Sequence, residues 1–365
     1  MLPARYDRKP GTGRGWAGVR RQGQHGGVPA LPPLPVPYHA TAVRPDWSAL
    51  PAGLRAAVAD RLGAPVVSAR TATAGFTGGF AALLTGADGG RIFVKAADLT
   101  HQRHLADWYA REAAVLARLP AGVPVPRPRW ALTASGWYAL ALDAVDGRTP
   151  RLPWDRTELD AVLAGYAELA TALADPPAEL VALGLPRLAD LARDDILWWG
   201  EVAAGREPAP PMPAAAHGRL PELVALESRL PGYAAAGRGL VHGDLRVDNV
   251  LLDSGGRAWF CDWNWVCHGP AWFDLAGLLI TGYADGLPVD AIFAGHPAAA
   301  GAPPDALDVT LAALAGYYLT STAAGPPPAP PAPRPAPAVS PHLGAHQRFS
   351  GEQALRWLAV RQGWS

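Results

Sequence analysis

Two kinds of hydrophobic pattern divide this chain. Between Pro65 and Leu142 the apolar positions predict strand, Gly-rich turn, strand, turn, strand, helix and strand, in that order. The stretch "RIFVKAA" carries the third strand, with side chains alternating between its two faces. Before them, "DWSALPAGLRAAVADRLG" predicts a short helix. From about residue 150 helical periodicity dominates, so we expect a small strand-rich lobe followed by a larger helical lobe.

Two Gly- and Pro-rich segments interrupt this pattern. Residues 1–45 lack periodicity and contain the run "GVPALPPLPVP", so they are predicted to be a disordered tail. A second run, "GPPPAPPAPRPAPAVSP", precedes "HQRFSGEQALRWLAVRQGW", which is typical of an amphipathic helix that docks back. We interpret residues 326–341 as a loop insertion rather than as the polyproline ligand of a scaffold protein.

Composition narrows the class of protein. The chain has 365 residues, of which 49% are hydrophobic, enough for two lobes with a sizeable core. Thirty-two basic and 32 acidic residues give zero net charge, which does not favour nucleic-acid or membrane-surface binding. The N-terminus lacks the apolar region of a secretory signal, and no stretch approaches a membrane span. Two cysteines exclude a disulfide framework, so we expect a cytoplasmic protein.

One carboxylate falls on the apolar face of a predicted helix. In "THQRHLADWYAREAAVLARL", Glu112 lies between Tyr109 and Leu116 on a stripe with helical spacing. A buried carboxylate costs several kcal/mol unless it is paired. Lys95, which with Lys9 makes up all the lysine of the chain, lies on the preceding strand and is the candidate partner. The alternative is that Glu112 lies half-solvated at the edge of the stripe.

A glycine turn separates the first two strands. The stretch "TAGFTGGFAALL" holds Gly75, Thr77, Gly78 and Gly79, and glycine lets backbone N–H groups approach an anion without a Cβ in the way. The spacing matches neither a dinucleotide fingerprint nor a Walker motif. From these residues alone, a plain hairpin turn is favoured over a phosphate site.

The densest group of chemical residues is "GLVHGDLRVDNVLL". Asp244 precedes Asn249 by five positions, as in the kinase catalytic loop, with Gly243 in place of the usual arginine. A carboxylate there can orient a hydroxyl, and an amide oxygen can bind a metal without a further charge. Downstream, "WFCDW" ends a strand at Asp262, a second carboxylate suited to Mg²⁺. Asp248 is expected to pair with Arg246 or face solvent rather than bind metal.

Together these stretches resemble the aminoglycoside phosphotransferase/choline kinase family. The resemblance rests on "GFTGGF", "IFVK", the helix with Glu112, "VHGDLRVDNVLL" and "CDWNWVCHGPAWFDLAGLL", from about Ala74 to Leu279. It implies an α+β, two-lobed, protein-kinase-like fold. The N-lobe, 46–142, has a small antiparallel sheet with one long helix. A hinge, 143–150, leads to the helical C-lobe, 151–365.

The resemblance also implies a role for each matching residue. Asp244 is the expected catalytic base or hydroxyl-orienting carboxylate, and Asn249 and Asp262 are the expected Mg²⁺ ligands. Lys95 is expected to hold the α- and β-phosphates of ATP or GTP, under the glycine turn. The remaining expectations are Glu112 as partner of Lys95, Leu142 and Val145 as hinge contacts to the base, and His242 and Asp274 as structural support.

The function expected is transfer of a γ-phosphoryl group to the hydroxyl of a small molecule. An aminoglycoside or other antibiotic, an amino alcohol and a sugar metabolite all remain open as acceptors. The alternative is a catalytically inactive nucleotide-binding regulatory protein of the same fold. We expect no nucleic-acid or membrane partner, and either a monomer or a homodimer.

Overall fold

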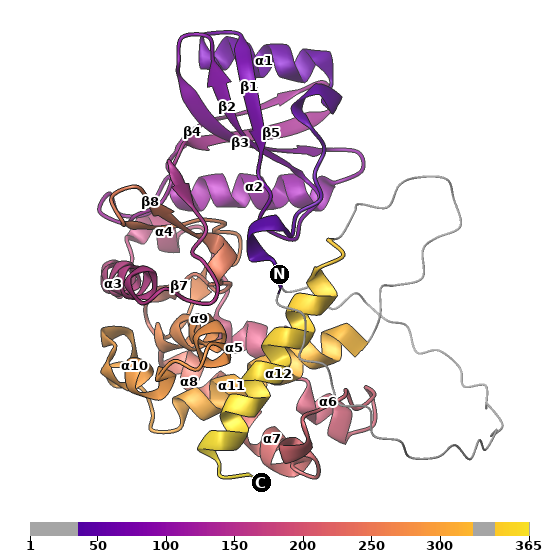
Figure 1. The fold of residues 1–365 in the computed structure, drawn as a ribbon, viewed down its shortest axis with the longest axis vertical. Coiled ribbons are helices and arrows are strands. Elements are labelled where there is room, and N and C mark those ends of the chain that lie inside the picture. Colours follow the sequence, from indigo (N-terminus) through magenta and orange to yellow (C-terminus); the bar gives the residue numbers. More distant parts are fainter. Residues whose placement is uncertain (1–35, 324–339, 365) are drawn as a thin grey trace, which may run out of the picture.

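The chain folds into two lobes joined by one short connection (Figure 1). The computed structural model describes residues 36–323 and 340–364. The smaller lobe is built on a sheet, and the larger one is mostly helical. This is the α+β, two-lobed arrangement expected from the sequence.

The N-lobe contains a five-stranded antiparallel sheet in the order β1-β2-β3-β5-β4. One helix covers each face, with α2 on the side toward the C-lobe (Figure 1). The elements are α1 (Ala52–Leu62), β1 (Val66–Thr71), β2 (Phe80–Gly86), β3 (Arg91–Asp98), α2 (Arg103–Leu116), β4 (Pro128–Ala134) and β5 (Trp137–Asp143).

The two-residue period of β3 determines which way its lysine points. Val94 and Ala96 belong to the core shared with α1, together with Leu54 and Val58 of that helix. Because side chains alternate along a strand, Lys95 points to the opposite face, toward α2. The sheet therefore directs the charged group at the cleft between the lobes.

The sequence pattern missed one strand of this sheet. It predicted a single strand after α2, whereas β4 and β5 form a hairpin that turns at Ser135 and Gly136. Edge strand β4 alternates between half-buried and exposed residues. Its apolar signal is therefore weaker than that of β5, which has four consecutive buried residues.

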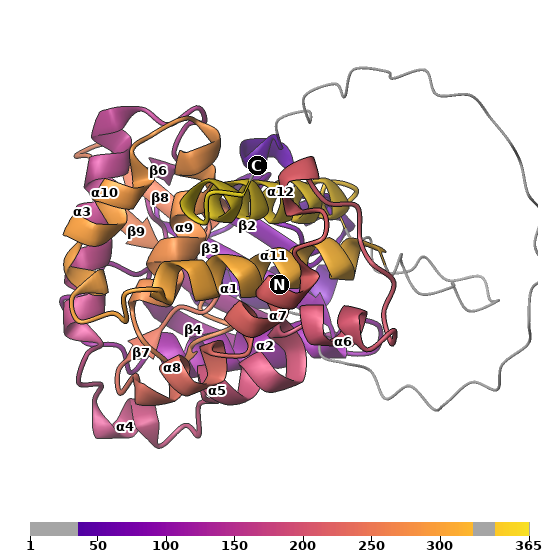
Figure 2. The ribbon, with the colours of Figure 1, turned by 90° about the horizontal axis from the view of Figure 1, so that it is seen from below.

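The C-lobe packs helices around the buried helix α9 (Trp272–Ala284). The terminal helix α12 (Leu343–Arg361) lies alongside α11 (Ala306–Ala323), which confirms that the last segment docks back (Figure 2). The other helices are α3 (Arg156–Ala172), α4 (Ala178–Val181), α5 (Leu188–Leu191), α6 (Trp199–Ala203), α7 (Leu220–Glu227), α8 (Leu230–Ala236) and α10 (Val289–Gly295).

Two small sheets in the C-lobe bring two loops together. Strand β7 (Leu240–Val241) pairs with β10 (Cys267–His268), and β8 (Val250–Asp253) pairs with β9 (Ala258–Phe260). The loop between β7 and β8 must then lie beside the loop between β9 and β10. The backbone N–H of Cys261 donates to the Asn249 carbonyl oxygen at 2.9 Å, which joins the two loops directly.

The predicted hinge also belongs partly to the C-lobe. Within residues 143–150, strand β6 (Gly147–Arg148) pairs with β8 as the third strand of its sheet. The connection from β5 to the C-lobe is therefore anchored next to the β7–β8 loop.

The boundary of the N-terminal tail was predicted wrongly. Residues 36–45, which the sequence assigned to a disordered tail, pack between the lobes, where Tyr38 and Thr41 are buried. Residues 1–35 and most of the Pro-rich insertion at 326–341 lie outside the described residues, although Ser340 is described and buried.

Candidate active site

The loop between β7 and β8 is held from behind by one buried carboxylate. Asp274, in the first turn of α9, accepts hydrogen bonds from the backbone N–H groups of His242 at 2.6 Å and Gly243 at 3.0 Å. Burial raises the pKa of Asp274 to about 6, although these bonds favour its charged form. Asp274 thus supports the loop, as expected from the resemblance.

His242 braces the same loop against its neighbour. The fully buried imidazole donates through Nε2 to the Cys261 carbonyl oxygen at 2.8 Å and accepts the Asp244 N–H at Nδ1, at 3.3 Å. Its ring lies 4.8 Å from that of Trp263. His242 therefore links the loop that carries Asp244 to the loop that carries Asp262.

The glycine at 243 has a steric cause. Its φ is +77°, and a Cβ at this position would lie 2.3 Å from the Trp265 carbonyl oxygen. An arginine, as in the kinase pattern, would need the neighbouring loop to move away. The close approach of the two loops thus requires glycine here.

Asp244 shares a cation with Asp248. The Arg246 guanidinium forms a short ion pair with Asp244 and donates to both oxygens of Asp248, each at 3.0 Å. Burial opposes ionisation of Asp244, but Arg246 outweighs it and holds the pKa of Asp244 well below its usual range. The Asp244 side chain is therefore a carboxylate at neutral pH. The expected pairing of Asp248 with Arg246 is present.

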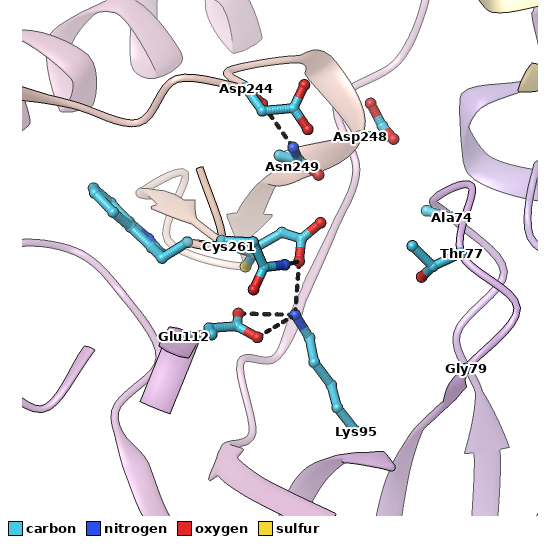
Figure 3. Close-up of polar contacts among 12 residues, drawn as sticks. Ala74, Thr77, Gly79, Lys95, Glu112, Asp244, Asp248, Asn249 and Cys261 are labelled. Atoms are coloured by element: carbon cyan, nitrogen blue, oxygen red, sulfur yellow. Dashed lines mark hydrogen bonds and ion pairs between the residues drawn. The ribbon is translucent and has the colours of Figure 1, made fainter. Parts of the chain in front are cut away.

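Asn249 and Asp262 place oxygen atoms on the same side of the loops. Asn249 Nδ2 donates to the Asp244 carbonyl oxygen at 2.7 Å, which leaves Asn249 Oδ1 as its free acceptor (Figure 3). Asp262 accepts from Asn264 Nδ2 at 2.6 Å, while the buried Oδ1 of Asn264 has no partner. These are the hard oxygen donors that Mg²⁺ prefers.

Lys95 connects the N-lobe to this oxygen cluster. Its Nζ lies 2.8 and 2.7 Å from the two oxygens of Glu112 and 2.9 Å from Asp262 Oδ1 (Figure 3). Burial opposes the charge of Lys95, but Asp262 and Glu112 raise its pKa well above the ordinary value. Glu112 is 1% exposed, so the ion pair expected from the helical stripe is present and the half-solvated alternative is wrong.

The glycine turn is tied down rather than free. Arg44 donates to the carbonyl oxygens of Ala74 at 3.1 Å and Gly79 at 3.0 Å, and to Thr77 Oγ1 at 3.5 Å. Gly75 has a φ of +100°. A Cβ at Gly79 would lie 2.3 Å from Tyr109 Oη of α2. Arg44, in the supposed tail, is a site residue that the sequence reasoning missed.

A cleft of about 1120 Å³ collects these groups from both lobes. In Figure 3, Ala74 and Thr77 face Asp248 and Asn249 across it. Its lining includes every predicted catalytic and metal residue, Lys95, Glu112, Gly75, Thr77 and both hinge residues, Leu142 and Val145. Residues absent from the prediction also line it: Val36, Tyr38, Arg44, Phe76 and Phe349.

Comparison of the sequence with family models identifies the chain. The phosphotransferase enzyme family (APH) matches residues 74–308. The chain belongs to this family. The matched segment contains Lys95, Glu112, Asp244, Asn249 and Asp262, and it ends before α12. No curated protein sequence matches the chain closely enough to count as a relative.

Solved structures of this family share the fold. The GDP complex of aminoglycoside 2'-phosphotransferase-IIIa has a TM-score of 0.58 at 15% identity, covering 86% of this chain and 100% of that one. Aminoglycoside phosphotransferase APH(4)-Ia, as a thermostable mutant with AMP-PNP and hygromycin B, gives 0.55 at 14%, covering 86% and 99%. The GDP and kanamycin complex of APH(2'')-IIIa gives 0.56 at 15%, covering 84% and 97%. At such identities the likeness establishes the fold alone.

Two features are absent from the described residues. Within residues 36–323 and 340–364, no helix is long and apolar enough to cross a membrane. The described part of the chain also has no cluster of three or more His, Cys, Asp or Glu side chains placed to hold a metal. A metal here would instead use two protein oxygens and draw its other ligands from water and phosphate, the usual arrangement for Mg²⁺.

Proposed function

We propose that this protein is a Mg²⁺-dependent phosphotransferase that moves the γ-phosphoryl group of ATP or GTP to a hydroxyl of a small molecule. The observation that carries the proposal is the convergence of Lys95, Asn249 and Asp262 on one cleft beside the ionised Asp244. Phosphoryl transfer needs little covalent chemistry from the protein and much placement.

Asp244 is the proposed catalytic residue. A carboxylate whose pKa is held low by Arg246 is a weak base, so its main task is to orient the acceptor hydroxyl and to take up the proton as transfer proceeds. Asp274 and His242 keep Asp244 in place through the loop backbone.

Asn249 and Asp262 are the proposed Mg²⁺ ligands. The free Oδ1 of Asn249 and the carboxylate of Asp262 make an oxygen-only donor set of low charge, and Asn264, whose own Oδ1 has no partner, donates to Asp262. Bound there, Mg²⁺ would neutralise charge on the nucleotide phosphates. Lys95, now held by Asp262 and Glu112, is the cation proposed to reach the α- and β-phosphates.

The nucleotide is proposed by analogy with the solved structures. Those of similar fold hold AMP-PNP or GDP, and the lining of the present cleft includes the apolar residues Leu142, Val145 and Leu251 below the glycine turn. Backbone groups near Leu142 and Val145 are the proposed contacts for the base.

The charges of the cleft bear on the acceptor. The similar structures hold kanamycin or hygromycin B, which are aminoglycosides. In this chain Asp244 and Asp248 already share Arg246, and Glu158 accepts from Arg148 and Arg151 beside the cleft. A polycation would have to compete with these arginines for the carboxylates. Amino alcohols, sugars and other antibiotics therefore belong beside aminoglycosides in any screen.

The test is a phosphate-transfer screen with labelled ATP and GTP against these acceptor classes. Asp244→Asn is expected to reduce transfer to the true acceptor at least about 1000-fold and to leave nucleotide affinity within about threefold, because Asp244 acts on the hydroxyl. Asp248→Asn is the matched control, because it changes the other carboxylate bound to the same guanidinium, and it should retain transfer within about tenfold.

Two results would count against the proposal. Normal turnover by Asp244→Asn would remove its assigned role. Nucleotide binding by the parent protein without transfer to any acceptor would favour the inactive regulatory protein.

A further inference from the structure

The glycine turn is held by a segment that lies before the N-lobe sheet. Residues 36–41, the strap, run beside the turn. Thr41 Oγ1 donates to the Gly75 carbonyl oxygen at 3.0 Å and accepts the Gly75 N–H at 3.1 Å. Thr73 Oγ1 donates to the His39 carbonyl oxygen at 2.6 Å. The start of the turn is therefore fixed to the strap through both the N–H and the carbonyl oxygen of Gly75.

The other end of the chain holds the same turn. Ser340, just before α12, donates its N–H to the Phe76 carbonyl oxygen at 3.4 Å, and its hydroxyl donates to the Thr41 carbonyl oxygen. Ser340 and Thr41 are both buried. Strap, glycine turn and the entry to α12 thus form one hydrogen-bonded unit across some 300 residues of sequence.

Phe76 carries the contact from the turn into the C-lobe. Its side chain is 4% exposed, although it belongs to a glycine-rich turn of the N-lobe. The ring stacks on His346 of α12, with centroids 4.9 Å apart, and the Arg246 guanidinium lies 5.3 Å from its centre. The tip of the turn is therefore pinned between α12 and the arginine that holds Asp244.

His346 is in turn fixed by the strap. Tyr38 Oη donates to His346 Nδ1 at 2.8 Å, and Ser350 Oγ lies 3.3 Å from the same nitrogen. Burial and the nearby Arg246 lower the pKa of His346 well below its ordinary value, so the ring is neutral and Nδ1 is an acceptor. Removing the Tyr38 hydroxyl would leave that buried nitrogen with a poorer partner.

We propose that Tyr38 and His346 are positioning residues of the phosphotransferase: through Phe76 they hold the glycine turn down over the nucleotide phosphates. The proposal rests on the proposed function. Both residues lie outside segment 74–308, which the family model matches. A turn held in advance over the phosphates loses less conformational entropy when the nucleotide binds.

The test compares ligands with and without phosphates. Tyr38→Phe removes one hydroxyl and keeps the ring. It is expected to weaken the binding of Mg-AMP-PNP or Mg-GMP-PNP by about 3- to 10-fold, the equivalent of one buried hydrogen bond. The affinity for adenosine or guanosine should not change, because neither reaches the glycine turn. Isothermal titration calorimetry on the full chain measures all four ligands.

Two further variants separate positioning from simple destabilisation. Arg361→Gln breaks the ion pairs of α12 with Asp290 and Asp308, far from the turn. It should lower the melting temperature at least as much as Tyr38→Phe and leave the Mg-AMP-PNP affinity unchanged. In a Phe76→Ala background, Tyr38→Phe should lose its effect on that affinity, because Phe76 carries the coupling.

The outcomes distinguish this inference from the proposed function. Unchanged Mg-AMP-PNP and Mg-GMP-PNP affinity in Tyr38→Phe, equal loss for the nucleosides, or full additivity with Phe76→Ala would overturn the positioning role while the kinase proposal stands. A parent protein that binds neither magnesium-nucleotide complex would overturn both.

Discussion

At the scale of single residues, Gly243 shows how close packing dictates a residue type. The kinase pattern places arginine before the catalytic aspartate, and this chain places glycine there. The cause is the Trp265 carbonyl oxygen, which occupies the space that a Cβ would need. The substitution is therefore linked to the tight contact of two loops, and through it to the position of Asp244.

Gly243→Ala is expected to be more damaging than the same change at another glycine with the same backbone angle. Gly136, in the β4–β5 turn, also has a φ of +77°, but nothing lies within 4 Å of its potential Cβ. An alanine at positive φ destabilises the folded state in both variants. In Gly243→Ala the clash between the two loops should lower the free energy of unfolding by about 1–3 kcal/mol more. Displacement of Asp244 should reduce transfer by up to about 100-fold.

Urea unfolding and transfer rates measured on both variants check this. Gly136→Ala serves as the control for backbone strain and should keep full transfer activity. Equal losses of stability in the two variants would show that the Trp265 contact does not constrain the site.

The site residues differ in how far the sequence could reveal them. Asp244, Asn249 and Asp262 lie in short motifs between strands, so the spacing within those motifs was enough to identify them as site residues. Glu112 was marked by its place on an apolar stripe. Tyr38 and His346 meet across 308 positions, and neither stands in a motif. The one available signal was the apolar and aromatic content of "VPYHATAV", which is unusual for a solvated tail.

At the scale of elements, hydrophobic periodicity predicted the helices and strands that bury one face, and it missed a strand at the edge of the sheet. Helices α1, α2 and α12 were expected from periodicity. Strand β4 was missed because, at the edge of the sheet, it buries little. Within the part of the chain where helical periodicity dominates, residues 188–203 divide into α5, a wider turn at Ala192–Ile196 and α6. The periodicity continues across breaks that only tertiary packing determines.

Helix α2 offers a direct comparison of a buried and an exposed ion pair. Glu112→Gln leaves Lys95 with Asp262 alone and should cost about 1.5–3 kcal/mol of unfolding free energy, typical of hydrogen bonds to charged groups. It should also weaken binding of Mg-AMP-PNP, because Lys95 is no longer fixed. Arg103→Gln breaks the exposed pair with Asp107 on the same helix and should cost below about 1 kcal/mol.

Chemical unfolding measures the stability of both variants, and nucleotide titration measures their affinity for Mg-AMP-PNP. If Glu112→Gln behaves like Arg103→Gln in both measurements, the buried pair has no special role in holding Lys95. The control lies on the same helix, and each variant replaces one charged member of an ion pair with glutamine.

At the scale of the whole molecule, stability depends on how buried titratable groups oppose one another. Burial raises the pKa of Glu227 to about 7, although its carboxylate accepts the N–H groups of Trp198 at 3.1 Å and Gly200 at 2.7 Å. Burial lowers the pKa of His296 and His346. The glutamate favours the folded state at low pH and the histidines favour it at high pH. The pH profile of the parent protein alone therefore mixes opposite contributions.

Comparing the parent with Glu227→Gln isolates the glutamate. The folded chain keeps the proton of Glu227 until about pH 7, whereas the unfolded chain loses it near the ordinary value of 4.5. The contribution of Glu227 to stability is thus complete below pH 4.5 and falls as the pH rises through 7. The stability of the parent relative to Glu227→Gln should fall across this window by at most about 1.4 kcal/mol per pH unit. Urea unfolding at half-unit steps measures it. The control is Glu222→Gln on the same helix, where backbone and Arg219 hydrogen bonds lower the pKa, so its difference curve should be flat above pH 5. A flat curve for Glu227→Gln as well would mean that Glu227 is ionised throughout.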